Sequence, residues 1–139
     1  MPDHPILLDT SYVFAPINPN DQWHAAATRL QARIKAEGKK IVTTEFVLTK
    51  IGDGLSALRF RKAASFVINL LLESPEIEII PATDELFRRA LELFDNRQDK
   101  SWGLTDCSSF VVMDDLGISE ALTTGDDFSQ AGFTALMLQ

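Results

Sequence analysis

The amino-acid sequence predicts an α/β fold in which helices cover both faces of a mainly parallel sheet of four or five strands. Short apolar segments, several of them rich in β-branched residues, alternate along the chain with longer segments whose apolar residues recur at helical spacing. Of the 139 residues, 45% are hydrophobic and 24% are charged. These proportions suit a globular protein with a sizeable core, and the length predicts one domain over residues 1–139.

The first half of the chain is expected to begin with a strand and a helix. Residues 5–9 have the apolar run that is typical of a short buried strand. Residues 18–38 have apolar side chains at helical spacing, the cap-type residues Asn20 and Asp21 near the start, and Gly38 as a stop. The next segments predict a strand at 39–44 and helices at 45–55 and 56–75.

The second half continues the alternation of strands and helices. Residues 76–81 alternate β-branched and charged side chains, which predicts a strand. Residues 82–97 predict a helix with Thr83 as its N-cap, in a sequence that resembles a capping box. Residues 104–117 predict another helix, capped at Thr105. The last expected elements are a strand at 120–125, a helical turn at 126–132 and a strand at 133–138.

The net charge limits how the protein can act. It is −7, from 20 Asp and Glu against 13 Lys and Arg. A protein that binds nucleic acid mainly through its overall field is usually basic. Either nucleic acid is therefore not the substrate, or it is held locally and the excess acid has another task, such as holding a divalent cation.

Cysteine content and hydropathy exclude further classes. Cys107 is the single cysteine, so an intramolecular disulfide is excluded, and no Cys/His cluster suggests a zinc site. The apolar runs are too short to span a bilayer, and the first residues lack the basic start and apolar region of a signal peptide. We expect a cytoplasmic protein without a membrane partner.

Several carboxylates are expected at one edge of the predicted sheet. Asp9 ends the first strand, Glu45 follows the second, Asp126 and Asp127 follow the fourth, and Asp106 lies in the first turn of a helix. Each acid alone has a simpler explanation, as a helix cap or a solvated residue of a first turn. In open parallel sheets, however, ligands bind beyond the carboxyl ends of the strands. The shared position of these acids therefore predicts a site.

This arrangement of acids predicts metal-dependent phosphodiester chemistry. Carboxylates that lie close together repel one another and cannot all stay ionised unless a cation joins them. Mg²⁺ or Mn²⁺ suits oxygen ligands, and such a site activates water and stabilises a phosphodiester during in-line displacement. A phosphatase of the haloacid-dehalogenase type is disfavoured, because its second acid, two residues after Asp9, would fall on Ser11.

Four segments carry a family resemblance. They are "LLDTSYVFA" (7–15), "TTEFVLTKIGDGLS" (43–56), "DKSWGLTDCSSFVVM" (99–113) and "ALTTGDDFSQAGF" (121–133). In order and spacing they resemble the PIN domain family, and particularly its VapC-type toxins, over essentially the whole chain. The resemblance implies a three-layer α/β/α sandwich and an endoribonuclease that depends on Mg²⁺ or Mn²⁺. It also implies an RNA substrate, a small antitoxin encoded beside the toxin, and a homodimer.

The resemblance also implies site residues. Asp9 matches the acid that ends the first strand, and Asp106 matches the acid at the start of the helix after the active-site loop. Asp99, in "DKSW", matches an acid that is common in this subgroup. The expected catalytic residues are Asp9, Asp106, Asp99 and Asp126, and the expected metal ligands are Asp9, Asp106, Asp126 and Glu45.

Two positions depart from the family pattern. Lys50 stands where the family has a glutamate, and Gly125 stands where it has an aspartate. Asp126, one residue late, is expected to replace that aspartate if Gly125 reshapes the turn, since glycine accepts unusual backbone angles. Glu45 could enter the site only from a suitably angled helix, whereas Asp53 lies on nearly the same helix face as Lys50. Lys50 could contact phosphate, replace the charge of a metal or weaken its binding.

Two basic clusters stand out in this acidic chain. "RFRK" (59–62) and "RR" (88–89) lie in predicted helices. Either could contact an RNA backbone, although a solvated helix face is the simpler explanation for each.

Two functions from different classes remain. The first is a PIN-type ribonuclease that is the toxin of a toxin–antitoxin pair. The second is a PIN-fold binding or regulatory module with an impaired metal site, which the replacements at Lys50 and Gly125 motivate. A phosphatase ranks third.

Overall fold

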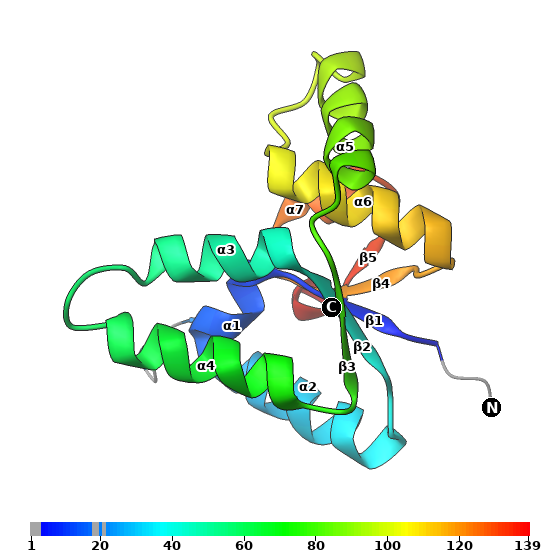
Figure 1. Cartoon of the computed structure of the whole chain (residues 1–139). Helices are drawn as coiled ribbons and strands as arrows, with labels where there is room; N and C mark the ends of the chain where they lie inside the picture. The colour runs from blue at the N-terminus through cyan, green and yellow to red at the C-terminus, as the bar shows by residue number, and fades with distance from the viewer. Residues whose placement is uncertain (1–3, 18–19, 21) are drawn as a thin grey trace.

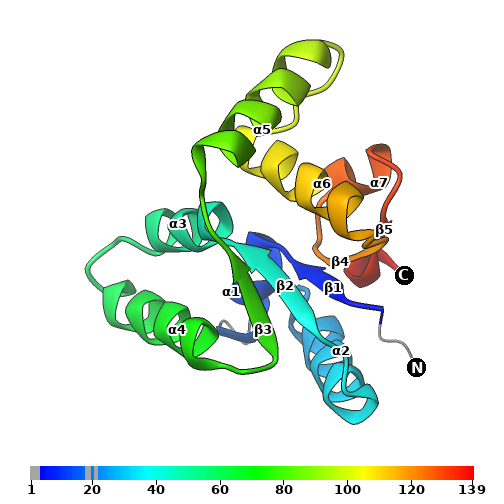
Figure 2. The ribbon, with the colours of Figure 1, turned by 45° about the vertical axis from the view of Figure 1, so that its right-hand side comes forward.

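A computed structural model of the protein describes residues 4–17, 20 and 22–139. In this part of the chain one sheet has five strands in the order β3-β2-β1-β4-β5, and every neighbouring pair is parallel. The strands are β1 (Ile6–Leu8), β2 (Ile41–Thr44), β3 (Ile77–Ile80), β4 (Glu120–Leu122) and β5 (Thr134–Ala135). Because β2 and β4 flank β1, the strand order reverses at the centre of the sheet (Figures 1 and 2). Open parallel sheets bind ligands at such a reversal.

Helices pack on both faces of the sheet, which confirms the predicted α/β/α sandwich. One core contains residues of α1 (Thr10–Ile17), α2 (His24–Glu37), α3 (Glu45–Gly54) and α4 (Arg61–Glu73). The other contains residues of α5 (Asp84–Asn96), α6 (Leu104–Leu116) and α7 (Asp126–Gln130). A 3₁₀ helix, η1 (Leu136–Leu138), follows β5. Across the described ranges, none of the helices is long and apolar enough to cross a membrane.

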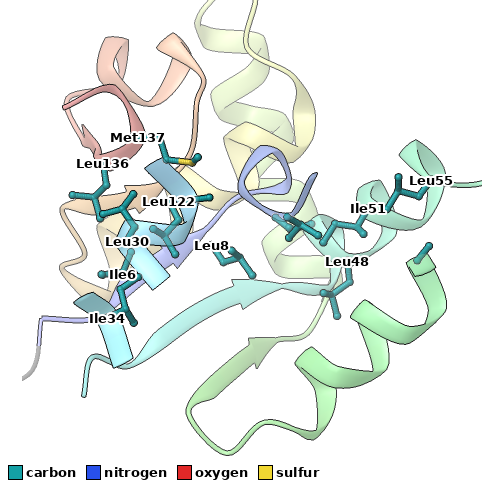
Figure 3. Packing of buried hydrophobic residues seen from close by; sticks show 14 residues of the cluster. Ile6, Leu8, Leu30, Ile34, Leu48, Ile51, Leu55, Leu122, Leu136 and Met137 are labelled. Carbon is teal, nitrogen blue, oxygen red and sulfur yellow. The ribbon is translucent and has the colours of Figure 1, made fainter. Parts of the chain in front are cut away.

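The central strands supply side chains to both cores. Ile6 and Leu8 of β1 lie in the core with α1 to α4 (Figure 3), and Leu7 between them lies in the core with α5 to α7. Leu122 and Ala121 of β4 divide in the same way. Successive residues of a strand face opposite sides of a sheet, so a strand covered on both faces is apolar at every position. This explains the unbroken apolar run that predicts the first strand.

Local sequence signals located several elements correctly. Thr83 is the N-cap of α5, and its hydroxyl accepts a hydrogen bond from the Leu86 N–H at 3.1 Å. Gly38 ends α2 in the left-handed region with φ 63°, a conformation that favours glycine. α3 begins at Glu45 as predicted, after Thr44 caps it.

Two helices begin later than predicted. The helix expected from residue 18 begins at His24, with Asn20 in a turn, while Asp21 lies outside the described residues. The helix expected from residue 56 begins at Arg61, because residues 57–60 form a bend and a turn. In both cases the helical spacing of apolar residues extended into a turn that packs beside the helix.

Three further assignments are corrected by tertiary contacts. α1 was not predicted, because its aromatic and β-branched residues are weak helix formers; Val13 packs into the core and stabilises it. The N-cap of α6 is Gly103 and not Thr105, since Asp106 accepts the Gly103 N–H. The strand expected at 133–138 is shortened to β5 and continues as η1.

An aromatic cluster fixes α7 against α6. Phe110 of α6 is buried, and its ring meets the rings of Trp102 and Phe128 edge to face at centroid distances of 5.0 and 4.9 Å. The Trp102 indole N–H also donates to the Gln130 side chain at 3.2 Å. The loop before α6, α6 itself and α7 are thereby joined next to the acids that α6 and α7 carry.

Candidate active site

Asp9 lies at the reversal of strand order, immediately after β1. Its backbone N–H donates to the Leu122 carbonyl at 3.1 Å, which holds the end of β1 against the end of β4. Its side chain is only 7% exposed. Thr123, which follows β4, donates its hydroxyl hydrogen to Asp9 Oδ2 at 2.8 Å, and Ser11 donates to the same oxygen at 3.1 Å. Two hydroxyl donors stabilise the ionised carboxylate and fix its orientation.

A second pair of contacts holds this end of the sheet together. The Thr124 N–H donates to the Ser11 hydroxyl at 3.0 Å, and the Gly125 N–H donates to the Thr123 hydroxyl at 3.0 Å. Sequence reasoning missed the roles of Ser11 and Thr123. The signal was present in the hydroxyl residues that follow each strand, in "LLDTS" and "ALTTG".

Asp106 is the second buried acid. It is the third residue of α6, is 8% exposed, and accepts the Gly103 N–H on Oδ2 at 3.1 Å. Burial raises its pKa from 3.8 to about 6, and the negative charge of Asp9 adds to this rise. The Gly103 hydrogen bond and the ammonium of Lys50 act in the opposite direction. The structure therefore brings Asp9, Asp106 and Lys50 together, as the sequence predicted for the two acids.

Asp127 is a third carboxylate at this site. Its side chain makes a smaller contribution to the raised pKa of Asp106, after burial and the charge of Asp9, because a nearby carboxyl group favours the protonated form. The sequence indicates Asp126 because it lies one residue after the position, three residues before Phe128, where the family has its acid. Among the described residues, the acids that act on the pKa of Asp106 are Asp9 and Asp127. The role of Asp126 stays a prediction.

The turn before α7 has an ordinary backbone at Gly125. Gly125 has φ −90° and ψ 139°, an ordinary extended conformation that any residue adopts. Gly125 therefore does not reshape the turn through an unusual backbone conformation, which was the condition set for Asp126. A Cβ added there would meet the Thr123 hydroxyl at 3.5 Å, an ordinary contact distance.

Two other predicted residues have partners elsewhere. Glu45 is exposed, and its Oε1 accepts the Ala82 N–H at 2.7 Å, which joins the start of α3 to the segment between β3 and α5. Asp99 forms a two-pronged ion pair with Arg97, with nitrogen–oxygen distances of 3.0 and 3.1 Å. The Arg97 hydrogen bond lowers the pKa of Asp99. Their places in the active site stay predictions.

The acids present fit a Mg²⁺-type ion held largely by water. Across the described ranges, no three His, Cys, Asp or Glu side chains form a ready-made metal site. Mg²⁺ is commonly bound through one or two carboxylates and keeps several waters. Both recorded side-chain bonds to Asp9, and the backbone bond to Asp106, end on Oδ2. None of these hydrogen bonds uses the Oδ1 atom of either acid.

Comparisons with known proteins agree with this geometry. The sequence model of a family described as "PIN domain" matches residues 6–134. The 23S rRNA-specific endonuclease VapC20 of Mycobacterium tuberculosis is 30% identical over 128 residues, which cover 92% of this chain and 95% of that protein. The crystal structure of VapC20, titled a sarcin–ricin loop cleaving toxin, matches with TM-score 0.81 and 28% identity, over 93% of this chain and 96% of that one.

Two more distant structures share the fold. VapBC2 from Rickettsia felis, solved with a DNA fragment from its promoter, matches with TM-score 0.68 over 94% of this chain and 96% of that chain. FitAcB from Neisseria gonorrhoeae matches with TM-score 0.66 over 94% of each chain. Both are 15% identical to this chain, a level at which the likeness concerns the fold alone.

The raised pKa of Asp106 predicts a pH-dependent cost to stability. The folded state binds this proton more tightly than the unfolded chain, because the pKa is raised to about 6 from 3.8. The free energy of unfolding is therefore expected to fall as pH rises between these values and to stay lower above them. The cost at neutral pH is roughly 3 kcal/mol, at 1.36 kcal/mol per pKa unit.

Asp106→Asn should remove this cost while keeping an acceptor for the Gly103 N–H. Urea unfolding should show the variant more stable than the natural protein by roughly 3 kcal/mol near pH 8, and close to it near pH 4. Asp114→Asn, at an exposed acid of the same helix, is the matched control and should show no such step. Parallel pH profiles for the natural protein and Asp106→Asn would contradict the prediction.

Proposed function

We propose that this chain, which belongs to the PIN domain family, is an endoribonuclease that hydrolyses RNA phosphodiester bonds with a divalent cation. The observation that carries the proposal is the buried carboxylate pair, Asp9 and Asp106, at the reversal of strand order. VapC20, a relative over nearly the whole chain, is named for cleavage of 23S rRNA. RNA is therefore the substrate class that we propose for this chain.

Mg²⁺ or Mn²⁺ is the cation that we propose. Asp9 and Asp106 would hold it, with Asp127 beside them and Asp126, Asp99 and Glu45 as predicted helpers. When bound, the cation would polarise the phosphodiester and supply an activated water.

The surrounding residues prepare the carboxylates for this task. Thr123 and Ser11 hold Asp9 by its Oδ2. Lys50 lowers the pKa of Asp106, which partly offsets burial and favours the ionised form that binds a cation. The lysine at the place of the family's glutamate therefore supports Asp106 electrostatically.

A small antitoxin is the protein partner that we propose. An apolar groove of about 340 Å³ lies between α1, α2, α4 and the sheet. Leu70 of α4 lines it and is 57% exposed, and Tyr12 and Val13 of α1 lie opposite in the same groove. α1 starts directly after Asp9, so an occupant would contact the helix that adjoins the active site. The expected homodimer stays a prediction.

The activity is tested by removing one carboxylate charge. Asp9→Asn should lower the rate of RNA cleavage in Mg²⁺ or Mn²⁺ at least about a hundredfold, because several kcal/mol of charge stabilisation depend on the cation. Asp114→Asn should cleave like the natural protein. Cleavage is followed on labelled RNA, with a chelator as a further control. Equal rates for Asp9→Asn and the natural protein would overturn the proposal.

A second candidate is a PIN-fold binding module whose metal site is impaired. It is favoured by the absence of a three-ligand group among the described residues and by Lys50 beside Asp106. Calorimetric titration with Mn²⁺ separates the two functions. Binding that Asp106→Asn abolishes supports the enzyme, and no binding by the natural protein supports the module.

A second test of whether the metal site is impaired places the family's acids at positions 50 and 125. We expect Lys50→Glu/Gly125→Asp to change the cleavage rate by less than about tenfold, which corresponds to roughly 1.4 kcal/mol. The added side chain at Gly125 meets only an ordinary contact, so the variant should fold. A gain of far more than tenfold would instead show that the natural site is degenerate.

The antitoxin groove is tested with a matched pair of leucines on α4. Leu70 lines the groove, whereas Leu72, 53% exposed on the same helix, does not. Leu70→Asp should abolish co-purification with the small protein encoded beside this chain and leave RNA cleavage unchanged. Leu72→Asp should keep both co-purification and RNA cleavage. Retained co-purification by Leu70→Asp would exclude this groove.

A further inference from the structure

A group of three cations without neighbouring acids in the sequence lies between α3 and α4. The net charge is −7, yet residues 54–72 contain Arg59, Arg61 and Lys62 and no Asp or Glu. We call these three residues the hairpin cations. They lie at the turn between the two helices and at the start of α4, which Figures 1 and 2 show at the far end of the α3–α4 hairpin from the sheet.

Ion pairing separates two clusters that look alike in the sequence. Arg88 pairs with Asp84 at 2.9 Å, and Arg89 pairs with Asp115 at 2.6 Å. In the part of the chain that the structure describes, no carboxylate lies within 4.0 Å of the hairpin cations. The "RR" cluster is therefore neutralised within the protein, while the "RFRK" cluster keeps its charge for a ligand.

The guanidinium groups of the hairpin are held in place without being neutralised. Arg61 donates from Nη1 to the Ser56 carbonyl at 3.0 Å and lines a hollow of about 280 Å³ between the end of α3 and the start of α4. The Arg59 guanidinium lies over the Phe60 ring, 4.7 Å from its centroid. Both arginines keep further N–H groups for an oxyanion, because a guanidinium has five donors.

Lys50 connects this surface with the acidic site. Its ammonium is close enough to Asp106 to lower the pKa of that acid. Four residues later α3 ends at Gly54, which is about 6 Å along the helix axis at 1.5 Å per residue. The hairpin follows directly after Asp53 and Gly54, so α3 links Lys50, beside the carboxylates, with the hairpin cations at the start of α4.

We propose that the α3–α4 hairpin binds the phosphate backbone of the RNA substrate through Arg59, Arg61 and Lys62, beyond the bond that is cleaved. The proposal rests on the proposed ribonuclease function and names where its substrate lies. An acidic chain repels a polyanion overall, so binding needs a local surface of unpaired cations. Arginine fork geometry matches phosphate oxygens.

RNA binding without a divalent cation tests the proposal. Fluorescence anisotropy of a labelled single-stranded RNA oligonucleotide is measured in chelator over a range of salt concentrations. For Arg59→Gln/Arg61→Gln/Lys62→Gln, the slope of log K against log salt should become shallower by about 2, at about 0.7 per lost phosphate contact. Affinity at low salt should fall at least about tenfold.

A second triple variant controls for net charge. Arg33→Gln/Arg88→Gln/Arg89→Gln also takes the net charge from −7 to −10, but it removes cations that are paired with Glu37, Asp84 and Asp115. This variant should keep the natural slope. Arg59→Lys/Arg61→Lys retains the positive charges and should also keep the natural slope. This result would show that the slope depends on the charge and not on an effect of the substitutions on folding.

Each other outcome overturns the proposal. Equal losses of RNA affinity in the two Gln triples would show a general effect of net charge. If the natural protein did not bind RNA, RNA would be excluded as the ligand of the hairpin. Normal RNA binding by the hairpin triple, with loss of the small protein partner, would make the hairpin a protein-binding surface. RNA binding is measured in chelator and does not depend on cleavage. A natural protein that binds RNA but does not cleave it in Mg²⁺ or Mn²⁺ would therefore contradict the proposed function and not the hairpin proposal.

Discussion

The hydrogen bond from Thr123 to Asp9 is the contact on which the site depends. It joins residues that are 114 positions apart in the sequence, across the ends of β1 and β4. The Asp9 N–H to Leu122 carbonyl bond fixes the backbones beside it, and Ser11 binds both the carboxylate and the turn after β4. A buried carboxylate must be hydrogen-bonded to be tolerated, and here the same bonds set its direction.

Asp106 shows the cost of gathering acids in a core. Burial and the neighbouring carboxylates of Asp9 and Asp127 raise its pKa, whereas Gly103 and Lys50 lower it. These opposing effects leave a group whose charge is only partly compensated within the protein. A cation would complete the compensation, so the stability lost as pH rises from 3.8 to about 6 and the affinity for metal have one physical origin.

The distribution of ion pairs organises the rest of the surface. Arg88, Arg89 and Arg97 are each committed to a nearby aspartate, which removes them as sites for an anion. The cations of the α3–α4 hairpin have no such partner among the described residues. The acids at the sheet edge and the hairpin cations are joined by α3, and we propose that they serve the metal and the phosphate chain of one substrate.

The sequence by itself determined the parallel sandwich, the cap at Thr83 and the stop at Gly38. These features depend on periodicity, or on contacts within a few residues. The choice of Asp9 and Asp106 as the central acids rested on their expected places at the sheet edge and on the family motifs around them. Only the tertiary structure decided that Asp127 acts on the pKa of Asp106, that Glu45 binds the Ala82 N–H 37 residues away, and that two similar basic clusters differ in pairing. Such contacts depend on how distant elements pack, which no local pattern encodes.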